Sequence, residues 1–350
     1  MKIVFFVHSL ASCWNHGNAH FLRGVVRELR EAGHDVDVWE PADGWSRSHV
    51  DQGTLAALSR RFPSRTYRRA LDVAAALDGA DVAIVHEWNE PWLVAAVGAN
   101  GVRALFHDTH HRAVTKPDEM RRYDLSGYAG VLAFGAAIAE VYRDRSWHDR
   151  VWTWHEAADH RLFRPLDRER RRDLVWIGNW GDGERTRELE EFLFEPALRL
   201  RLTGTVHGVR YPADGIRAVE RAGLGYRGWL PNHRVPEAFA AHRVTVHVPR
   251  RPYVDALPGI PTIRVFEALA AGIPLVSAPW EDTEGLFRDG DFLWARTGRE
   301  MEGALREALA DPSRAARGRE TVLTRHTCAH RVRELLSILA GLGIREAVAA

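Results

Sequence analysis

Residues 2–41, "KIVFFVHSLASCWNHGNAHFLRGVVRELREAGHDVDVWEP", contain two strand-like apolar runs with a helical pattern between them. The first apolar run, "KIVFFVHSL" (2–10), predicts a buried strand. In "AHFLRGVVRELREAGH" (19–34), apolar residues recur at helical spacing and Gly33 supplies a stop signal, so a helix is expected. "DVDVWEP" (35–41) predicts the next strand. A strand, a helix and a strand in succession are typical of a parallel α/β sheet.

The same alternation continues along the chain. Further strands are expected within 80–88, 102–110, 130–135 and 150–157, and again within 174–180, 200–208, 224–230, 244–250, 274–279 and 292–296. Between the two series, segment 161–174 holds a proline and dense charge, which indicates a linker or a domain edge. From about Arg331, apolar residues share one face of a terminal helix. We therefore expect an α/β protein with Rossmann-like domains at 1–165 and 166–330 and a C-terminal helix at 331–350.

The composition is that of a soluble globular protein. Of the 350 residues, 45% are apolar and 27% are charged, and the formal net charge of +1 favours neither nucleic acid nor an anionic membrane as a partner. No apolar run reaches the roughly 18 residues that a membrane span needs. Cys13 and Cys328 are the only cysteines, so we expect no disulfide framework and a cytoplasmic location. Because Lys2 and Lys116 are the only lysines, any phosphate would be bound by arginine, histidine or backbone N–H groups.

Polar residues follow several expected strands of the first half. His86, His107 and His155 each stand at the carboxyl end of a different strand, with acidic residues beside them. Ligands of open α/β folds bind at this edge of the sheet, and histidine suits proton transfer at neutral pH, so these three are candidate catalytic residues. Structural histidines are one alternative. A metal site built from "HDTHH" (107–111) and "HEAADH" (155–160) is another, but the spacing matches no zinc motif and we expect no metal.

A glycine-containing loop in the second half is a candidate diphosphate site. The segment "LVWIGNWGDGERTREL" (174–189) predicts a strand, a loop and the start of a helix. Asn179 and Arg185 could receive a diphosphate there through N–H groups and a guanidinium. Alternatively, Arg185 pairs with Glu184 or Glu188 on the protein surface.

Four further residues at strand ends are candidate ligand-binding residues. Gly17 precedes the first expected helix, whose N–H groups favour an anion, although a plain loop glycine explains it as well. His207 and Gly208 follow one strand of the second half, and Arg250 follows another.

The segment "IPTIRVFEALAAGIPLVSAP" (260–279) places a guanidinium and a carboxylate in a nearly apolar run. It predicts a helix over 262–271, capped by Thr262 and ended by Gly272. Arg264 and Glu267 then share a face, where Arg264 favours phosphate and Glu267 could accept hydrogen bonds from sugar hydroxyls. A simple Arg264–Glu267 salt bridge is the alternative, and a surface pair of that kind contributes only about 0–1 kcal/mol.

Several of these segments resemble a known family. "RVFEALAAGIPLVSAP" (264–279), "EGLF" (284–287) and "HTCAHRVRELLSIL" (326–339) resemble the C-terminal domain of GT-B glycosyltransferases of the family 1 and family 4 type, and most closely the bacterial CgeB-like group. Segments 131–145, 152–165 and 176–196 fit the same group. The resemblance implies two Rossmann-like domains facing a cleft, a nucleotide-sugar donor held mainly by the second domain, a C-terminal helix that crosses back to the first, and no obligatory metal or other cofactor.

The resemblance also implies roles for single residues. The family's ribose-binding glutamate matches Glu267, its sugar-contacting histidine matches His86, and its phosphate-binding basic pair falls near Arg185 and Arg187. Many relatives carry a second glutamate eight residues before the ribose glutamate, where this chain has Gly259.

Taken together, these features predict a hexosyltransferase-like enzyme. It would move a sugar from a nucleotide-diphosphate-sugar to an unknown acceptor without a metal. A metal-dependent hydrolase that uses the His and Asp clusters, a non-catalytic nucleotide-sugar-binding protein and a GT-B epimerase are the alternatives.

Overall fold

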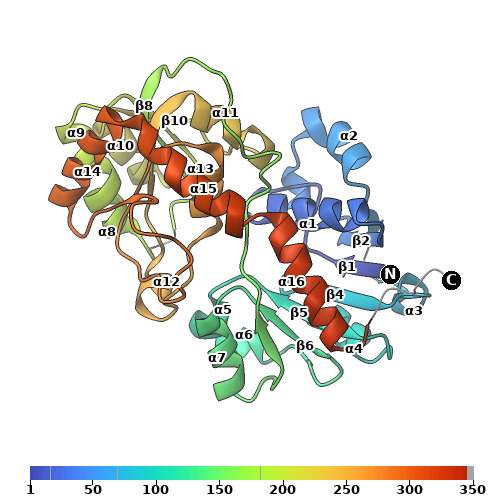
Figure 1. Cartoon of the computed structure of the whole chain (residues 1–350). Coiled ribbons are helices and arrows are strands. Elements are labelled where there is room, and N and C mark those ends of the chain that lie inside the picture. The colour runs from blue at the N-terminus through green and yellow to red at the C-terminus, as the bar shows by residue number, and fades with distance from the viewer. Residues whose placement is uncertain (16, 69, 182, 345–350) are drawn as a thin grey trace. The chain divides into compact units, whose positions relative to one another are not determined.

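The chain forms two compact units in the computed structural model, which describes all residues except 16, 69, 182 and 345–350. The first unit contains Met1–Glu156 and the segment that begins at Cys328, and the second unit is Ala157–Thr327 (Figure 1). The chain thus passes from one unit to the other near residues 156 and 328. No helix of the described residues is long and apolar enough to cross a membrane.

The first unit is built on a parallel sheet of the order β3-β2-β1-β4-β5-β6-β7 in the described chain. Its strands are β1 (Lys2–Phe6), β2 (Asp35–Pro41), β3 (Arg65–Tyr67), β4 (Val82–His86), β5 (Ala104–Asp108), β6 (Gly130–Ala133) and β7 (Val151–Thr153). Its helices are α1 (Ala19–Glu31), α2 (Gln52–Arg61), α3 (Val73–Ala76), α4 (Pro91–Gly98), α5 (Arg112–Thr115), α6 (Pro117–Met120), α7 (Ala136–Asp144) and α16 (Cys328–Gly341). The expected strands and the helix in 19–34 are confirmed. The sequence did not indicate β3, because its three residues form no buried apolar run.

The terminal helix α16 packs beside α1 of the first unit (Figure 1). The thiol of Cys328 lies 3.8 Å from the carbonyl oxygen of Phe21, and the indole N–H of Trp154 donates to the carbonyl oxygen of Arg331 at 2.8 Å. The expected return of the C-terminal helix to the first domain is therefore confirmed, and the helix begins three residues before Arg331.

The second unit repeats the design with a parallel sheet of the order β10-β9-β8-β11-β12-β13. Its strands are β8 (Arg172–Ile177), β9 (Gly204–His207), β10 (Leu224–Tyr226), β11 (His242–His247), β12 (Leu275–Ser277) and β13 (Leu293–Trp294). Its helices are α8 (Thr186–Leu189), α9 (Glu195–Arg199), α10 (Ala213–Arg221), α11 (Val235–Ala240), α12 (Arg251–Asp255), α13 (Ile263–Ala271), α14 (Gly298–Ala310) and α15 (Ala315–Arg325). Apolar side chains of the strands join two core clusters, one containing Phe192 and Met301 and the other Phe239 and Phe266.

Helix α13 forms where the segment 260–279 predicts it. Gly272 ends it in the left-handed conformation, with φ of 70°, which glycine adopts without strain. Thr262 stands at the N-cap, but its hydroxyl makes no capping bond to the helix. It lies instead 3.1 Å from Nε2 of His247 on β11.

Candidate functional site

The carboxyl ends of β4 and β5 bring His86, Glu87 and Thr109 together in the first unit. The N–H of Trp88 donates to Nδ1 of His86 at 3.3 Å, and the side-chain amide nitrogen of Asn18 lies 3.2 Å from its Nε2. Nε2 lies 3.2 Å from the Thr109 hydroxyl, and that hydroxyl donates to Oε1 of Glu87 at 3.1 Å. Asn18 donates to the same hydroxyl at 2.8 Å. The imidazole is therefore connected through one hydroxyl to a buried carboxylate.

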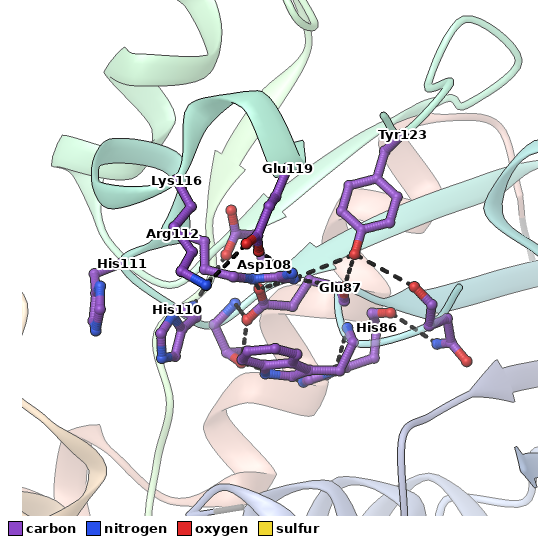
Figure 2. A network of polar contacts seen from close by, with 12 residues as sticks. His86, Glu87, Asp108, His110, His111, Arg112, Lys116, Glu119 and Tyr123 are labelled. Atoms are coloured by element: carbon purple, nitrogen blue, oxygen red, sulfur yellow. Dashed lines mark hydrogen bonds and ion pairs between the residues drawn. The ribbon is translucent and has the colours of Figure 1, made fainter. Parts of the chain in front are cut away.

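Arg112 neutralises that carboxylate (Figure 2). Its Nη2 lies 2.7 Å and its Nε 3.1 Å from Oε2 of Glu87, and its guanidinium lies over the Trp88 ring at 4.0 Å. The Tyr123 hydroxyl donates to the backbone oxygen of Glu87 at 2.5 Å. Burial lowers the pKa of Arg112, but the Glu87 carboxylate outweighs burial and the net shift is upward. The ion pair is thus complete and holds residues 86–88 in place.

Asp108 is a second buried carboxyl group beside this pair. It accepts from the Tyr142 hydroxyl at 2.8 Å and from the N–H of His110 at 3.0 Å. Burial and the neighbouring Glu87 carboxylate raise the pKa of Asp108 to about 8.

The structure gives different environments to the other first-unit candidates. His107 is fully buried, with its ring 5.3 Å from that of His86 and 4.8 Å from that of Trp154. Neither of its ring nitrogens hydrogen-bonds to a described residue, and burial lowers its pKa to about 3. This is a neutral core ring, and its geometry does not favour the proton-transfer role considered for it. His155 is buried, while Gly17 is exposed in the turn before α1.

Three arginines of the second unit are candidates for binding the diphosphate. Arg185 lies in the loop after β8, Arg250 follows β11, and Arg264 is in the first turn of α13. Arg185 is buried, donating to the backbone oxygens of Val248 at 3.1 Å and Asn179 at 2.5 Å. It makes no ion pair with any carboxylate among the described residues, and its Nε has no hydrogen-bond partner there. Burial, followed by the charges of Arg250 and Arg264, lowers its pKa to about 9. A buried cation without a carboxylate partner among the described residues is a candidate for binding an anionic ligand.

Glycines make room for this guanidinium. A Cβ on Gly178 would lie 3.2 Å from Nη2 of Arg185, and one on Gly181, whose φ is +100°, would lie 2.7 Å from Cγ of Arg185. Gly208 allows the loops after β8 and β9 to touch, since its Cβ would lie 2.0 Å from the oxygen of Gly178. The side chain of Asn179 accepts from the N–H of Val209 at 3.1 Å. Gly208 and the Asn179 side chain therefore shape the loop, and Arg185 is the group that this loop surrounds.

Three other charged candidates of the second unit, Arg250, Arg264 and Glu267, are paired. Glu267 is fully buried on α13 and forms an ion pair with Arg264, whose side chain is 15% exposed. Arg250 pairs with Glu184 at 2.6 Å. The Arg264–Glu267 salt bridge thus exists, but with the carboxylate buried inside the unit and not on its surface. Arg187 is exposed, and His207 is part-buried, with its pKa lowered to about 4, mainly by burial.

His247 is a residue of this region that the sequence analysis missed. Its Nδ1 lies 2.9 Å from the Ser277 hydroxyl and its Nε2 3.1 Å from that of Thr262, so it connects β11 and β12 to the start of α13. Burial lowers its pKa to about 3, and the positive charges of Arg185 and Arg264 act in the same direction. Its place inside the apolar strand "VTVHV" was the available signal, because a lone polar residue in a buried strand needs partners.

Gly259 occupies the position at which the family resemblance implies a glutamate in many relatives. Its φ is +84°, and a Cβ there would lie 2.6 Å from the Thr283 hydroxyl and 3.0 Å from Oε1 of Glu284. A larger residue does not fit, and a carboxylate from another segment lies beside the position.

No group of three or more His, Cys, Asp or Glu side chains among the described residues is placed to hold a metal ion.

Comparison with known proteins identifies the family of this chain. The model of a family described as glycosyl transferase-like matches residues 160–337, slightly more than half of the chain. The chain belongs to this glycosyl transferase-like family. A comparison with curated proteins finds no significant match.

Solved structures show the same fold across the whole chain. An alpha-glucosyltransferase in complex with UDP and a 13-mer DNA containing a HMU base is 12% identical, with a TM-score of 0.70 over 97% of this chain and 99% of that one. Anabaena HepE in complex with UDP-glucose is 12% identical, with a TM-score of 0.69 over 97% and 100%. Sucrose-phosphate synthase from Thermosynechococcus elongatus is 14% identical, with a TM-score of 0.65 over 98% and 99%. The expected GT-B fold is confirmed.

Proposed function

We propose that the protein transfers a hexosyl group from a UDP-hexose to an acceptor hydroxyl, and that arginines meet the charge of the diphosphate without a metal ion or other cofactor. The observation that carries the proposal is Arg185, a buried guanidinium held by two carbonyl oxygens and by no described carboxylate. Membership of the glycosyl transferase-like family and the UDP and UDP-glucose named for structural neighbours support the choice of donor.

In this reaction the bond between the sugar carbon and the diphosphate oxygen breaks as the acceptor oxygen bonds to that carbon. The acceptor proton is released to solvent, and negative charge grows on the departing UDP. A cation already fixed in a site of low dielectric stabilises such charge without reorganising at the moment of reaction. Arg185 is fixed in this way, and Arg250 and Arg264 add to the positive potential around it.

The buried carboxylate of Glu267 would accept hydrogen bonds from the ribose hydroxyls, which places the nucleoside next to α13. In the first unit, His86 would orient the transferred sugar by hydrogen bonding or help to move the acceptor proton.

The matching segments also lead us to propose a CgeB-like subgroup, a bacterial source and a cytoplasmic location. A non-catalytic nucleotide-sugar-binding protein is the second candidate, and Gly259 favours it, because the acid of the relatives is missing at that position.

Titration of the purified protein with UDP, followed by an assay of UDP release from UDP-hexoses, tests the proposal. We expect UDP binding, slow turnover of at least one UDP-hexose and faster turnover with an acceptor. Glu267→Ala should raise the donor KM by more than tenfold, which corresponds to about 1.4 kcal/mol or more. Unchanged donor binding in Glu267→Ala would refute the ribose assignment, and UDP binding without turnover would favour the second candidate.

A further inference from the structure

Three tryptophans stand at the carboxyl edge of the first-unit sheet. Trp14 follows β1, Trp45 follows β2 and Trp88 follows β4, and these strands are parallel neighbours. The ring centroids of Trp14 and Trp45 are 6.1 Å apart, and those of Trp45 and Trp88 are 6.3 Å apart. We call these three residues the indole platform. Trp45 is 38% exposed, which is unusual for a large apolar side chain in contact with other rings.

Each indole of the platform is supported on one face by another residue. His49 stacks on Trp14 at 3.8 Å, His8 stacks on Trp45 at 4.1 Å, and the guanidinium of Arg112 lies over Trp88 at 4.0 Å. The indoles are thus held at fixed angles, because rings packed on one side lose the freedom to turn.

The loops that carry the platform are also held by buried hydrogen bonds. Glu40, which is fully buried, accepts from the Ser9 hydroxyl at 2.9 Å and the N–H of Leu10 at 2.9 Å. It also accepts from Arg47 at 2.6 Å, so one carboxylate joins the loop after β1 to the loop after β2. The Ser46 hydroxyl donates to the backbone oxygen of Trp14 at 2.9 Å. A surface prepared in this way binds a ligand without the cost of ordering its side chains.

We propose that the indole platform is the subsite for a carbohydrate acceptor, with a pyranose ring lying on the exposed indole surface. This inference rests on the proposed function and adds the chemical class of the acceptor. Its location agrees with the rule that ligands of open α/β sheets bind at the carboxyl ends of the strands. The arginines proposed to bind the diphosphate belong to the second unit, whereas the platform belongs to the first.

The ring geometry favours a sugar over a planar aromatic acceptor. The indole planes of Trp14 and Trp45 meet at 67° and those of Trp45 and Trp88 at 83°, so these pairs form no parallel slot into which a flat ring could slide. They offer single faces, which suit the C–H face of a pyranose. The platform also favours an uncharged ligand, because Arg112, the cation against it, is already neutralised by Glu87.

Isothermal titration without donor tests the proposal. The probes are maltose, cellobiose, lactose and chitobiose, with 4-nitrophenol, quercetin and a 13-mer DNA duplex as competing classes. We expect at least one disaccharide to bind and Trp45→Ala to weaken it about fivefold to tenfold, the size of one lost aromatic contact. Trp45→Phe should recover part of the affinity, because a phenyl ring keeps one stacking face. The melting temperature of each variant reports whether it folds.

Trp147 provides the matched control. It is a part-buried tryptophan that follows α7, and since α7 starts at the carboxyl end of β6 its far end lies at the opposite edge of the sheet. Trp147→Ala should leave disaccharide affinity unchanged, and Trp45→Ala should leave UDP affinity unchanged. The proposal is overturned if no disaccharide binds, if a folded Trp45→Ala binds as tightly as the unaltered protein, or if only the phenols or the DNA bind. Because the titration needs no donor, it is independent of failure in the UDP assays.

Discussion

Arg112 of the first unit and Arg185 of the second are both buried at the carboxyl ends of parallel strands, yet their partners differ. Arg112 meets the Glu87 carboxylate with two nitrogens and covers Trp88. Arg185 meets only the carbonyl oxygens of Asn179 and Val248 among the described residues, with Arg250 and Arg264 raising the local positive potential. The first cation is complete without a ligand, so its role is to position its neighbours. The second has no carboxylate partner among the described residues, and for this reason we propose it as the anion-binding group.

The largest effect expected from this difference is a loss of stability in Arg112→Met. Removing one partner of a buried ion pair leaves Glu87 uncompensated, at a typical cost of about 3–5 kcal/mol. Urea unfolding followed by circular dichroism measures the change. The double variant Glu87→Gln, Arg112→Met should recover much of the loss, and a single variant as stable as the unaltered protein would contradict the positioning role.

A smaller effect, on binding and not on stability, is expected for Arg185→Met. The variant removes a buried cation that has no described counter-ion, so the free energy of unfolding should stay level or rise. UDP affinity should fall about 30-fold to 100-fold, or about 2–3 kcal/mol, because a charge-assisted contact to the diphosphate is lost. Calorimetric titration with UDP measures it, and Arg221→Met, an exposed arginine at the end of α10, serves as the control. Equal UDP affinities in the two variants would remove the distinction between Arg185 and Arg112.

The smallest of these effects concerns pH. The pKa of His107 is about 3 in the folded protein, because of burial, and near 6.5 in an unfolded chain. Between these two pH values His107 is protonated in the unfolded chain but not in the folded protein. The free energy of unfolding therefore falls as pH decreases from 6.5 toward 3.

His107→Phe isolates that contribution. Between pH 7 and pH 5 the unaltered protein should lose about 2 kcal/mol more stability than the variant, since the variant lacks the group that protonates on unfolding. Urea titrations of both proteins at the two pH values give the difference. The comparison cancels the opposite contribution of Asp108, whose raised pKa is present in both proteins. Parallel pH profiles would show that His107 is not the neutral core ring described above.

Local sequence patterns predicted most of the strands and helices of this protein. Alternating apolar runs and helical spacing predicted both sheets, because the burial of a strand or of one helix face fixes the spacing of apolar residues along the chain. The same reasoning located α13 and α16, since Thr262, Gly272 and the apolar face of the terminal helix are local signals. The position of the candidate residues at strand ends was predictable too, because each follows an apolar run that reads as a strand.

The folded structure was needed to show which of those charged residues have a partner of opposite charge. Whether a charge is neutralised depends on partners far away in the chain: Arg112 finds Glu87 25 residues earlier, and Asn18 meets Thr109 across 91 residues. Burial likewise made His107 a neutral core ring, although its position at a strand end matches that of His86. The sequence gives only the separation of these groups along the chain, whereas charge compensation and desolvation depend on their distances in the folded structure.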